Sequence, residues 1–356
     1  MTGRMLVPTL LLAGCRGGPQ RVLEPMGPQA AHIHGLWNTF LAICTGVFVL
    51  VVAALLLAIL RRRVDPEIGS SPPAVDAEAL PPQERRAHRH VIAVEPAVER
   101  GLSRWVAASV VLTVVLLLVL LVANILTGKA LTKLPHEQAL EVEVLGRQWW
   151  WEFKYRDPVP SRLLTTANEL HIPVGRTVEF TLKADDVIHS LWVPNLGGKK
   201  DLIPGRTATL RLRADKAGVY RGQCAEYCGT QHAKMALLVF SVSDADFEAW
   251  ADRQRSTAPE PESDEQKRGR ELFVNGTCAM CHAIQGTPAN GRRAPDLTHF
   301  AGRETLGAGA VPNTRGHLAG WIVDPHGIKP GVNMPAHTTL SGSDLHALVA
   351  YLESLK

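Results

Sequence analysis

Two long uncharged runs constrain the fold of this chain more than any other feature. Residues 36–60 and 105–126 contain no charged side chain. Each run is long enough to cross a bilayer as a helix, which takes about 20 apolar residues. A soluble fold would have to bury both runs entirely, and their length makes that unfavourable. The sequence therefore predicts a multidomain membrane protein with a transmembrane hairpin within residues 33–128.

Charges around these runs predict the orientation of the hairpin. Arg61, Arg62 and Arg63 follow the first run directly, and the positive-inside rule places that end in the cytoplasm. The Pro-, Glu- and Arg-rich loop 64–104 is expected to be solvated and poorly ordered. Everything after Lys129 then lies on the outer face of the bacterial cytoplasmic membrane.

The first fifteen residues have the pattern of an export signal. Arg4 precedes an apolar stretch, and Leu12-Ala13-Gly14 lead into Cys15. Small residues before a cysteine resemble a bacterial lipoprotein cleavage box, which would make Cys15 the lipidated N-terminus. An ordinary signal peptide or a retained leader remains the alternative.

A change of periodicity marks a second region, predicted as a domain over residues 129–250. Apolar residues alternate with polar ones in four segments, and turn signals such as 173–175 and 203–205 separate them. Short strands with polar turns predict an all-β sandwich or small barrel. The segments are 141–145, 177–182, 207–213 and 235–242.

A polar, Pro-containing linker is predicted over residues 251–264, followed by a smaller helical domain over 265–356. Asp264 is expected to cap the first helix and Ser343 the last. The last helix has an apolar face made of Leu345, Leu348, Val349 and Leu352.

The β domain contains a dense cluster of soft ligands. Cys224, Cys228, His232 and Met235 follow one another at intervals of four, four and three residues. Thiolate, imidazole and thioether groups suit copper, and two thiolates are enough to bridge two copper ions. A Cys224–Cys228 disulfide in an exported domain is the alternative, but it leaves the spacing of the His and Met unexplained. His189, which follows a predicted strand, is a candidate for a second imidazole.

The C-terminal domain contains the sequence Cys278-Ala-Met-Cys281-His282. Two thiols spaced in this way and followed by His predict covalent haem c with His282 as proximal iron ligand. A thioredoxin-like pair would not require the His, and a zinc site would require a second ligand pair. Met334 is the expected distal ligand, because Met280 lies inside the attachment motif. The other histidines, including His299, are expected on the surface.

Residues 33–243 resemble subunit II of a haem-copper cytochrome c oxidase, and the C-terminal domain resembles a class I cytochrome c. The family's fold would be a two-helix hairpin, an all-β cupredoxin domain (a Greek-key barrel) and an all-α cytochrome c domain. The matching stretches are 148–151, 186–189, 200–206 and 224–235.

This resemblance implies a role for each matching residue. It implies a dinuclear CuA centre held by side chains and by the backbone carbonyl of Glu226, whose carboxylate would reach a magnesium ion shared with subunit I. Trp149 would be the surface tryptophan that receives electrons. The carbonyl of Pro295 would accept the proton of the proximal histidine. The implied copper-ligating side chains are His189, Cys224, Cys228, His232 and Met235.

The chain departs from the family in two places. Trp150 stands where the family usually has Tyr. Leu102 stands where some members have a glutamate for proton uptake, and nearby Glu99 receives no role.

The implied function is electron transfer from an external donor, a cytochrome c or another membrane-side carrier, through haem c and CuA to subunit I, where oxygen is reduced and protons are translocated. Subunit III is a further expected partner. The net charge of +4 gives no indication of nucleic-acid binding. A CuA-containing nitric oxide reductase and a stand-alone membrane-bound electron carrier are the alternatives. A quinol oxidase is excluded, because that relative lacks the copper cysteines.

Overall fold

The computed structural model describes residues 20–61, 96–135 and 137–356. The predicted leader with Cys15 and most of the loop between the two apolar runs lie outside the described residues. The chain divides into two compact units, Gly35–Gly128 and the remainder, which comprises the residues up to His34 and Lys129–Lys356.

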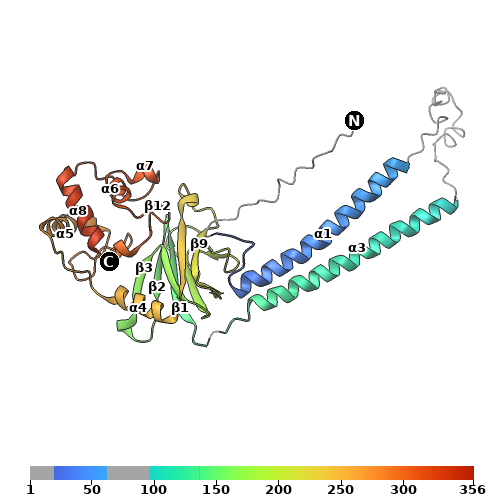
Figure 1. Cartoon of the computed structure of the whole chain (residues 1–356), viewed down its shortest axis with the longest axis horizontal. Helices are drawn as coiled ribbons and strands as arrows, with labels where there is room; N and C mark the ends of the chain where they lie inside the picture. Colours follow the sequence, from blue (N-terminus) through green and yellow to red (C-terminus); the bar gives the residue numbers. More distant parts are fainter. Residues whose placement is uncertain (1–19, 62–95, 136) are drawn as a thin grey trace, which may run out of the picture. The chain divides into compact units, whose positions relative to one another are not determined.

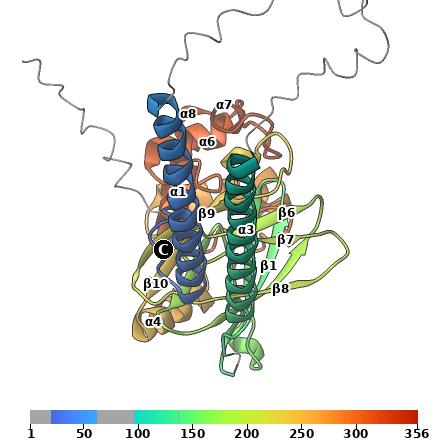
Figure 2. The same ribbon diagram turned by 90° about the vertical axis from the view of Figure 1, so that its right-hand side faces the viewer.

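The first unit consists of two long helices that run in opposite directions, α1 (Pro28–Arg61) and α3 (Pro96–Leu131) (Figures 1 and 2). By length and composition, both are able to cross a membrane. Their apolar side chains are exposed on all sides; Phe48, for example, is 67% exposed and Leu60 80%. A helix that is apolar all round requires lipid or other helices around it.

Both helices are longer than the apolar runs. Each begins at a proline, Pro28 or Pro96, which suits the first helical position because its missing N–H needs no partner there. Residues 96–104, expected to belong to a poorly ordered loop, are therefore helical. That prediction was wrong because charge composition does not exclude a helix that continues beyond the apolar run.

Ten strands of the second unit form two five-stranded sheets with the orders β3-β2-β1-β5-β8 and β4-β10-β9-β6-β7. The first sheet contains β1 (Leu140–Arg147), β2 (Trp150–Tyr155), β3 (Leu164–Ala167), β5 (Val178–Ala184) and β8 (Ala208–Leu212). The second contains β4 (Glu169–Pro173), β6 (His189–Trp192), β7 (Lys200–Leu202), β9 (Gly218–Cys224) and β10 (Ala236–Val242).

Alternation along the strands builds the core of this sandwich. In β2 and β5 every second side chain is buried, as the period-two pattern predicts. Phe153 and Leu182 from the first sheet share one apolar core with Leu170 of the second. Neighbouring strands are antiparallel except β1–β5 and β4–β10, which are parallel. The predicted all-β domain is confirmed, in the form of two separate sheets.

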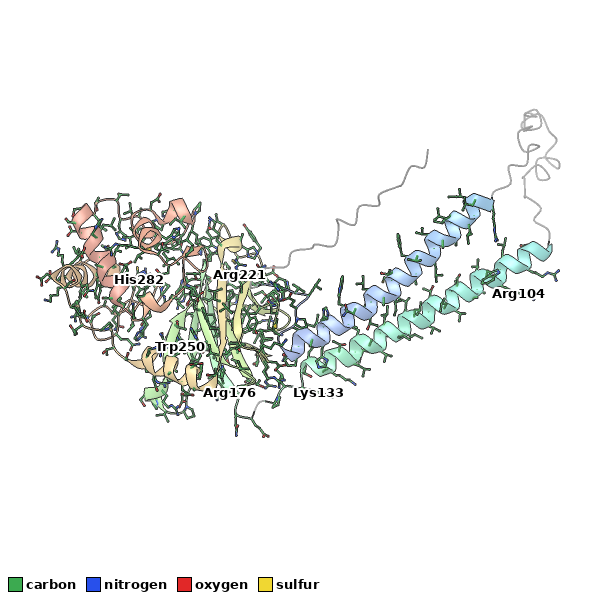
Figure 3. The ribbon with its side chains drawn as sticks, viewed as in Figure 1. Arg104, Lys133, Arg176, Arg221, Trp250 and His282 are labelled. Atoms are coloured by element: carbon green, nitrogen blue, oxygen red, sulfur yellow. The ribbon has the colours of Figure 1, made fainter. Side chains whose placement is uncertain are left out.

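Helix α4 (Asp244–Arg255) closes one end of the sandwich, capped by Ser243, whose side chain accepts the N–H of Asp246. Its Trp250 lies 5.4 Å from the ring of Tyr155 (Figure 3). Residues 251–255, which were assigned to the linker, are helical. Their polar sequence disguised the helix, because only Ala251 among them is buried against the sheet.

The C-terminal domain is mainly helical, and α5 packs closely on α8: a side chain added at Gly269 would clash with the carbonyl of Ala347. Ser263 and Ser341 cap these helices, so the predicted caps were wrong by one and two residues. The domain's elements are α5 (Asp264–Asn275), β11 (Thr305–Leu306), β12 (Val311–Pro312), α6 (Arg315–Val323), α7 (Pro325–Ile328) and α8 (Gly342–Ser354). Short 3-10 turns of the unit cover Pro160–Arg162, His232–Lys234, Thr277–Met280 and Phe300–Gly302.

Candidate metal centre and haem-attachment site

Residues 224–235 form a loop between the antiparallel neighbours β9 and β10. The N–H of Cys224 donates to the carbonyl of Met235 at 2.9 Å, which closes the loop at its base. In the adjacent strand β6, Leu191 pairs with Cys224. The sheet therefore brings His189, 35 residues upstream, beside the loop.

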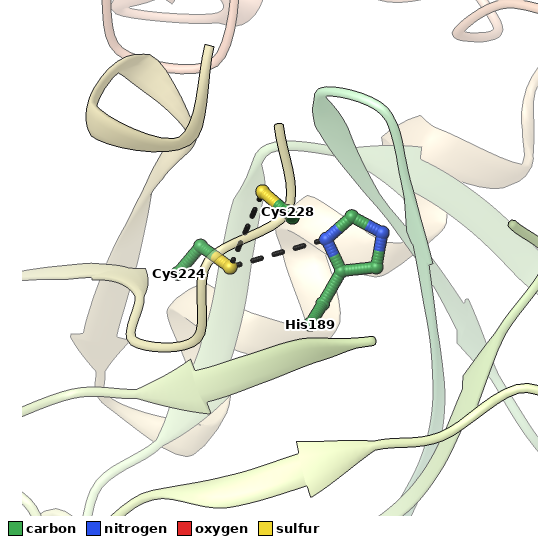
Figure 4. Close-up of side chains that lie close together, drawn as sticks. All are labelled: His189, Cys224 and Cys228. Carbon is green, nitrogen blue, oxygen red and sulfur yellow. Dashed lines mark hydrogen bonds between the residues drawn. The ribbon is translucent and has the colours of Figure 1, made fainter. Parts of the chain in front are cut away.

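Figure 4 shows the centre of the cluster, formed by His189, Cys224 and Cys228. The two sulfur atoms lie 3.8 Å apart, and Nδ1 of His189 lies 3.9 Å from Sγ of Cys224. All three ligand atoms lie within 4.8 Å of one another. Both cysteines are free, which contradicts the disulfide alternative.

The other predicted donors surround the same two sulfurs. Nδ1 of His232 lies 3.7 Å from Sγ of Cys228, and Sδ of Met235 lies 3.9 Å from it. The backbone oxygen of Glu226 lies 3.2 Å from Sγ of Cys224. Each thiol therefore has one imidazole and one further donor beside it, and this arrangement fits two soft metal ions bridged by two thiolates.

Hydrogen bonding and burial shift the pKa values of the two thiols in opposite directions. The side chains of Cys224, Cys228 and Met235 are at most 2% exposed. The hydrogen bond with Cys228 lowers the pKa of Cys224 to about 3. The same hydrogen bond, together with burial, raises the pKa of Cys228. One thiolate is thus available at neutral pH, and thiolate is the form that binds metal.

Asp186 orients His189 from the side away from the thiols. Nε2–H of His189 donates to Oδ1 of Asp186 at 2.8 Å, and Oδ2 accepts the N–H of Gln148 at 2.6 Å. A carboxylate only accepts, so this bond fixes the tautomer and leaves Nδ1 of His189 free to bind metal. The sequence placed Asp186 in a matching stretch without giving it a role.

Trp149 is buried, although a surface position was expected. Only 9% of it is exposed, and its Nε1–H donates to the carbonyl of Cys228 at 2.9 Å. The side chain of Gln148 donates to the same carbonyl at 2.8 Å. The C-terminal domain contacts this segment, since Lys329 donates to the carbonyl of Trp149.

The Cys278–His282 motif lies on a tight turn of the C-terminal domain, where Figure 3 labels His282. The N–H of His282 donates to the carbonyl of Cys278 at 2.9 Å. Nδ1–H of the ring donates to the carbonyl of Pro295 at 2.7 Å. This second bond leaves Nε2 of His282 available as an axial ligand, so the geometry fits a c-type haem.

The remaining residues of this domain are less closely defined by contacts. Met334 is half-buried, and no hydrogen bond or ring contact of the described residues joins it to His282. Met280 is 67% exposed. His299 was expected on the surface but is buried. Its two ring nitrogens each lie 3.0 Å from a backbone carbonyl oxygen, one of Ser256 and one of Lys356.

Sequence reasoning missed three residues that connect the two domains. Lys329 and Asn333 donate across the domain boundary to the backbone carbonyls of Trp149 and Gln148. The side chain of Gln148 then donates within the sandwich to the carbonyl of Cys228. Their sequence context gives no periodic or motif signal. Lys329 is unusual only because it is buried, and its buried environment is created by the fold and is not visible in the sequence.

Two family models match the chain. Residues 158–242 match the cytochrome c oxidase subunit II periplasmic domain, and residues 266–356 match cytochrome c. A solved structure of the periplasmic domain of subunit II of cytochrome oxidase of Bradyrhizobium japonicum is 30% identical, with a TM-score of 0.31. It covers 33% of this chain and 93% of its own.

Curated relatives match a longer stretch. Cytochrome c oxidase subunit 2 of Alkalihalophilus pseudofirmus is 39% identical over 220 residues, which are 62% of either chain. That of Bacillus subtilis is 37% identical over 230 residues, 62% of this chain and 63% of its own. The match thus spans about three-fifths of the length of these relatives. The chain is thus similar to the periplasmic domain of cytochrome c oxidase subunit II over residues 158–242 and to cytochrome c over residues 266–356.

Proposed function

We propose that this chain is the electron-transferring subunit II of a bacterial haem-copper cytochrome c oxidase. It receives electrons from a cytochrome c or another membrane-side donor at a covalent haem c. It passes them through a dinuclear CuA centre to subunit I, where oxygen is reduced to water with proton translocation. The observation that carries this proposal is the convergence of four further predicted donors on one pair of thiols.

The residues that would hold the copper pair are those of the cluster. Cys224 and Cys228 would supply the thiolates, His189 and His232 would bind through Nδ1, and the thioether of Met235 and the carbonyl of Glu226 would complete the set. When bound, a thiolate-bridged copper pair supplies one-electron transfer with little change in geometry. The rest is the work of the protein: closed loop ends, buried ligands and the Asp186 bond keep the donors in place and exclude water.

The residues that would hold haem are Cys278 and Cys281 through thioether bonds, His282 through Nε2, and Met334 on the opposite face. Haem held by His and Met supplies electron transfer at a raised potential. Pro295 keeps the ring of His282 in one tautomer and orientation. No residue of the described chain is required to move a proton for this task.

The membrane side of the proposal rests on α1 and α3. Their exposed apolar surfaces fit insertion in the cytoplasmic membrane beside subunit I and subunit III, with both cofactor domains on the outer face. The carboxylate of Glu226 would reach a magnesium ion shared with subunit I, and Cys15 would carry lipid after removal of the leader.

The experiment is electron paramagnetic resonance of the purified complex. We expect a mixed-valence signal with hyperfine splitting from two equivalent copper nuclei, together with a c-type haem absorption spectrum. Turnover with a reduced cytochrome c is then compared with oxygen and with nitric oxide as oxidant. A mononuclear copper signal would contradict the CuA assignment. Turnover with nitric oxide but not with oxygen would identify the complex as a nitric oxide reductase instead of an oxidase.

A further inference from the structure

The C-terminal domain contacts the sandwich through two segments. In the first, the carboxylate of Glu169 in β4 accepts the N–H groups of Glu304 and Thr305, each at 2.9 Å. The N–H of Ala236, directly after Met235, donates to the carbonyl of Ala308 at 2.9 Å. These bonds attach residues 304–308 to β4 and to the start of β10, which directly follows the metal loop.

The second segment, residues 328–334, contacts the metal loop itself. Gln231 donates from its side chain to the carbonyl of Pro330. Lys234 donates to the carbonyl of Ile328 at 2.6 Å. Both donors belong to the 224–235 loop, so the loop and the 328–334 segment are directly bonded to each other.

Lys329 is the central residue of this contact. It is only 1% exposed, and its Nζ donates to the carbonyls of Trp149 at 2.7 Å and Gly307 at 2.8 Å. Burial lowers the pKa of Lys329 to about 7. An ammonium group is costly to bury, and the carbonyl groups from both domains compensate only while the domains are docked.

A hydrogen-bonded bridge begins at the next polar residue of the same segment. Nδ2 of Asn333 donates to the backbone oxygen of Gln148 at 2.9 Å. The side chain of Gln148 in turn donates to the carbonyl of Cys228 at 2.8 Å. Asn333 is the neighbour of Met334 in the chain. The bridge thus runs from beside the proposed distal haem ligand to a proposed copper ligand.

We propose that Lys329 is a positioning residue that docks the haem domain on the metal loop, and that Asn333 and Gln148 form the path by which electrons pass between the two centres within the chain. This inference rests on the proposed function. One electron leaves the haem iron, which is oxidised by one, and arrives at the copper pair, which is reduced by one. No bond is made or broken.

Docking also determines where an external donor can act. Trp149, which the family would present to a soluble cytochrome, is covered and bonded to Lys329. An external donor must then deliver its electrons at the haem domain, and the Asn333–Gln148 bridge carries them onward.

The first test measures docking without any metal. Hydrogen–deuterium exchange of the copper-free, haem-containing chain is followed at the amides of Ala236, Glu304 and Thr305, which are bonded across the boundary. In Lys329→Met, two buried carbonyls lose their partner, so exchange should accelerate roughly tenfold or more. The matched control is Lys267→Met, which removes an exposed lysine far from the contact. Equal exchange in the two variants would overturn the role of Lys329.

The second test separates the electron path from docking. Gln148→Met removes the donor to the carbonyl of Cys228 but keeps the backbone oxygen that Asn333 contacts. We expect unchanged amide exchange, unchanged copper and haem spectra, and severalfold slower electron transfer after photoreduction of the haem. An unchanged rate with both spectra intact would overturn the path while leaving the proposed function in place. Absence of either spectrum in the unaltered chain would instead overturn the proposed function.

Discussion

The two cofactor sites of this chain use opposite structural strategies. At the metal loop, four donors from β6 and the 224–235 loop lie beside a common pair of thiols. At the haem site, the described contacts organise the proximal half directly, through the turn at Cys278 and the bond from His282 to Pro295. Met334 approaches from a separate segment.

Cofactor size explains the difference. Two metal ions that share thiolates require ligands a few ångströms apart, so a sheet and one loop can hold all of them against one another. The axial ligands of a haem lie on opposite faces of a macrocycle, so they cannot touch. The protein alone can hold the ligands of a compact centre in place, whereas a haem itself forms part of the core that holds its ligands.

The largest expected effect comes from removing one of the two thiols. Cys228→Ser should abolish the dinuclear copper signal, because Cys228 lies beside Cys224, His232 and Met235. Haem should remain attached at Cys278 and Cys281. Paramagnetic resonance and haem absorption of one sample measure both outcomes, and retention of the two-copper hyperfine pattern would sink the ligand assignment.

The converse change is made at the haem. Met334→Leu should free one axial position, so the ligand-sensitive absorption bands shift while the covalent attachment and the copper signal persist. Met280→Leu, at an exposed position, serves as control. A haem spectrum unchanged by Met334→Leu would show that another residue is the distal ligand.

A smaller effect is expected from changing Asp186, the hydrogen-bond partner of the proposed ligand His189. Asp186→Asn removes the charge that fixes His189 through Nε2, and loss of such a partner typically weakens metal binding about 10- to 100-fold. Competition with a copper chelator measures the affinity. Asp185→Asn is the matched control, since Asp185 pairs with Arg147 and not with His189. Equal affinities in the two variants would argue against the orienting role.

A change of pH separates the two regions. His171 is stacked between Phe240 and Trp250, and burial lowers its pKa to about 4. Its folded pKa lies below the unfolded value of 6.5, so stability is complete above pH 6.5 and declines as pH falls towards 4. The loss is about 3 kcal/mol.

Denaturant unfolding of the sandwich between pH 7 and pH 4, followed by tryptophan fluorescence, measures this decline. His171→Phe should flatten it, because the ring stays stacked and no longer takes up a proton. An equally steep decline in that variant would assign the acid sensitivity to other groups. The haem spectrum, which depends on the other domain, should change less over the same range.

The sequence predicted the features that are local. Periodicity indicated the β domain, and fixed spacing indicated Cys224, Cys228, His232 and Met235, because all four fall on one loop. The distant His189 was proposed because two metals needed a second imidazole and it follows a predicted strand, and the structure places it beside Cys224. Helix caps were misplaced by one or two residues, because several polar side chains near each start compete for the same N–H groups.

What the sequence did not predict depends on contacts between domains. Trp149 and Lys329 are buried where the sandwich and the C-terminal domain meet, and neither residue differs in its local pattern from a surface residue. The role of Asp186 was missed for a related reason: a carboxylate three residues before a histidine becomes its partner only when the backbone turns in this particular way.

The bond between the N–H of Cys224 and the carbonyl of Met235 has an evolutionary consequence. It pins the two ends of the loop to strands whose register is fixed elsewhere. An exposed position between the ligands, such as Tyr227, which is 75% exposed, can then change without disturbing the sandwich. Selection can therefore adjust the surface that a redox partner meets while the metal-binding residues and the fold beneath them stay constant.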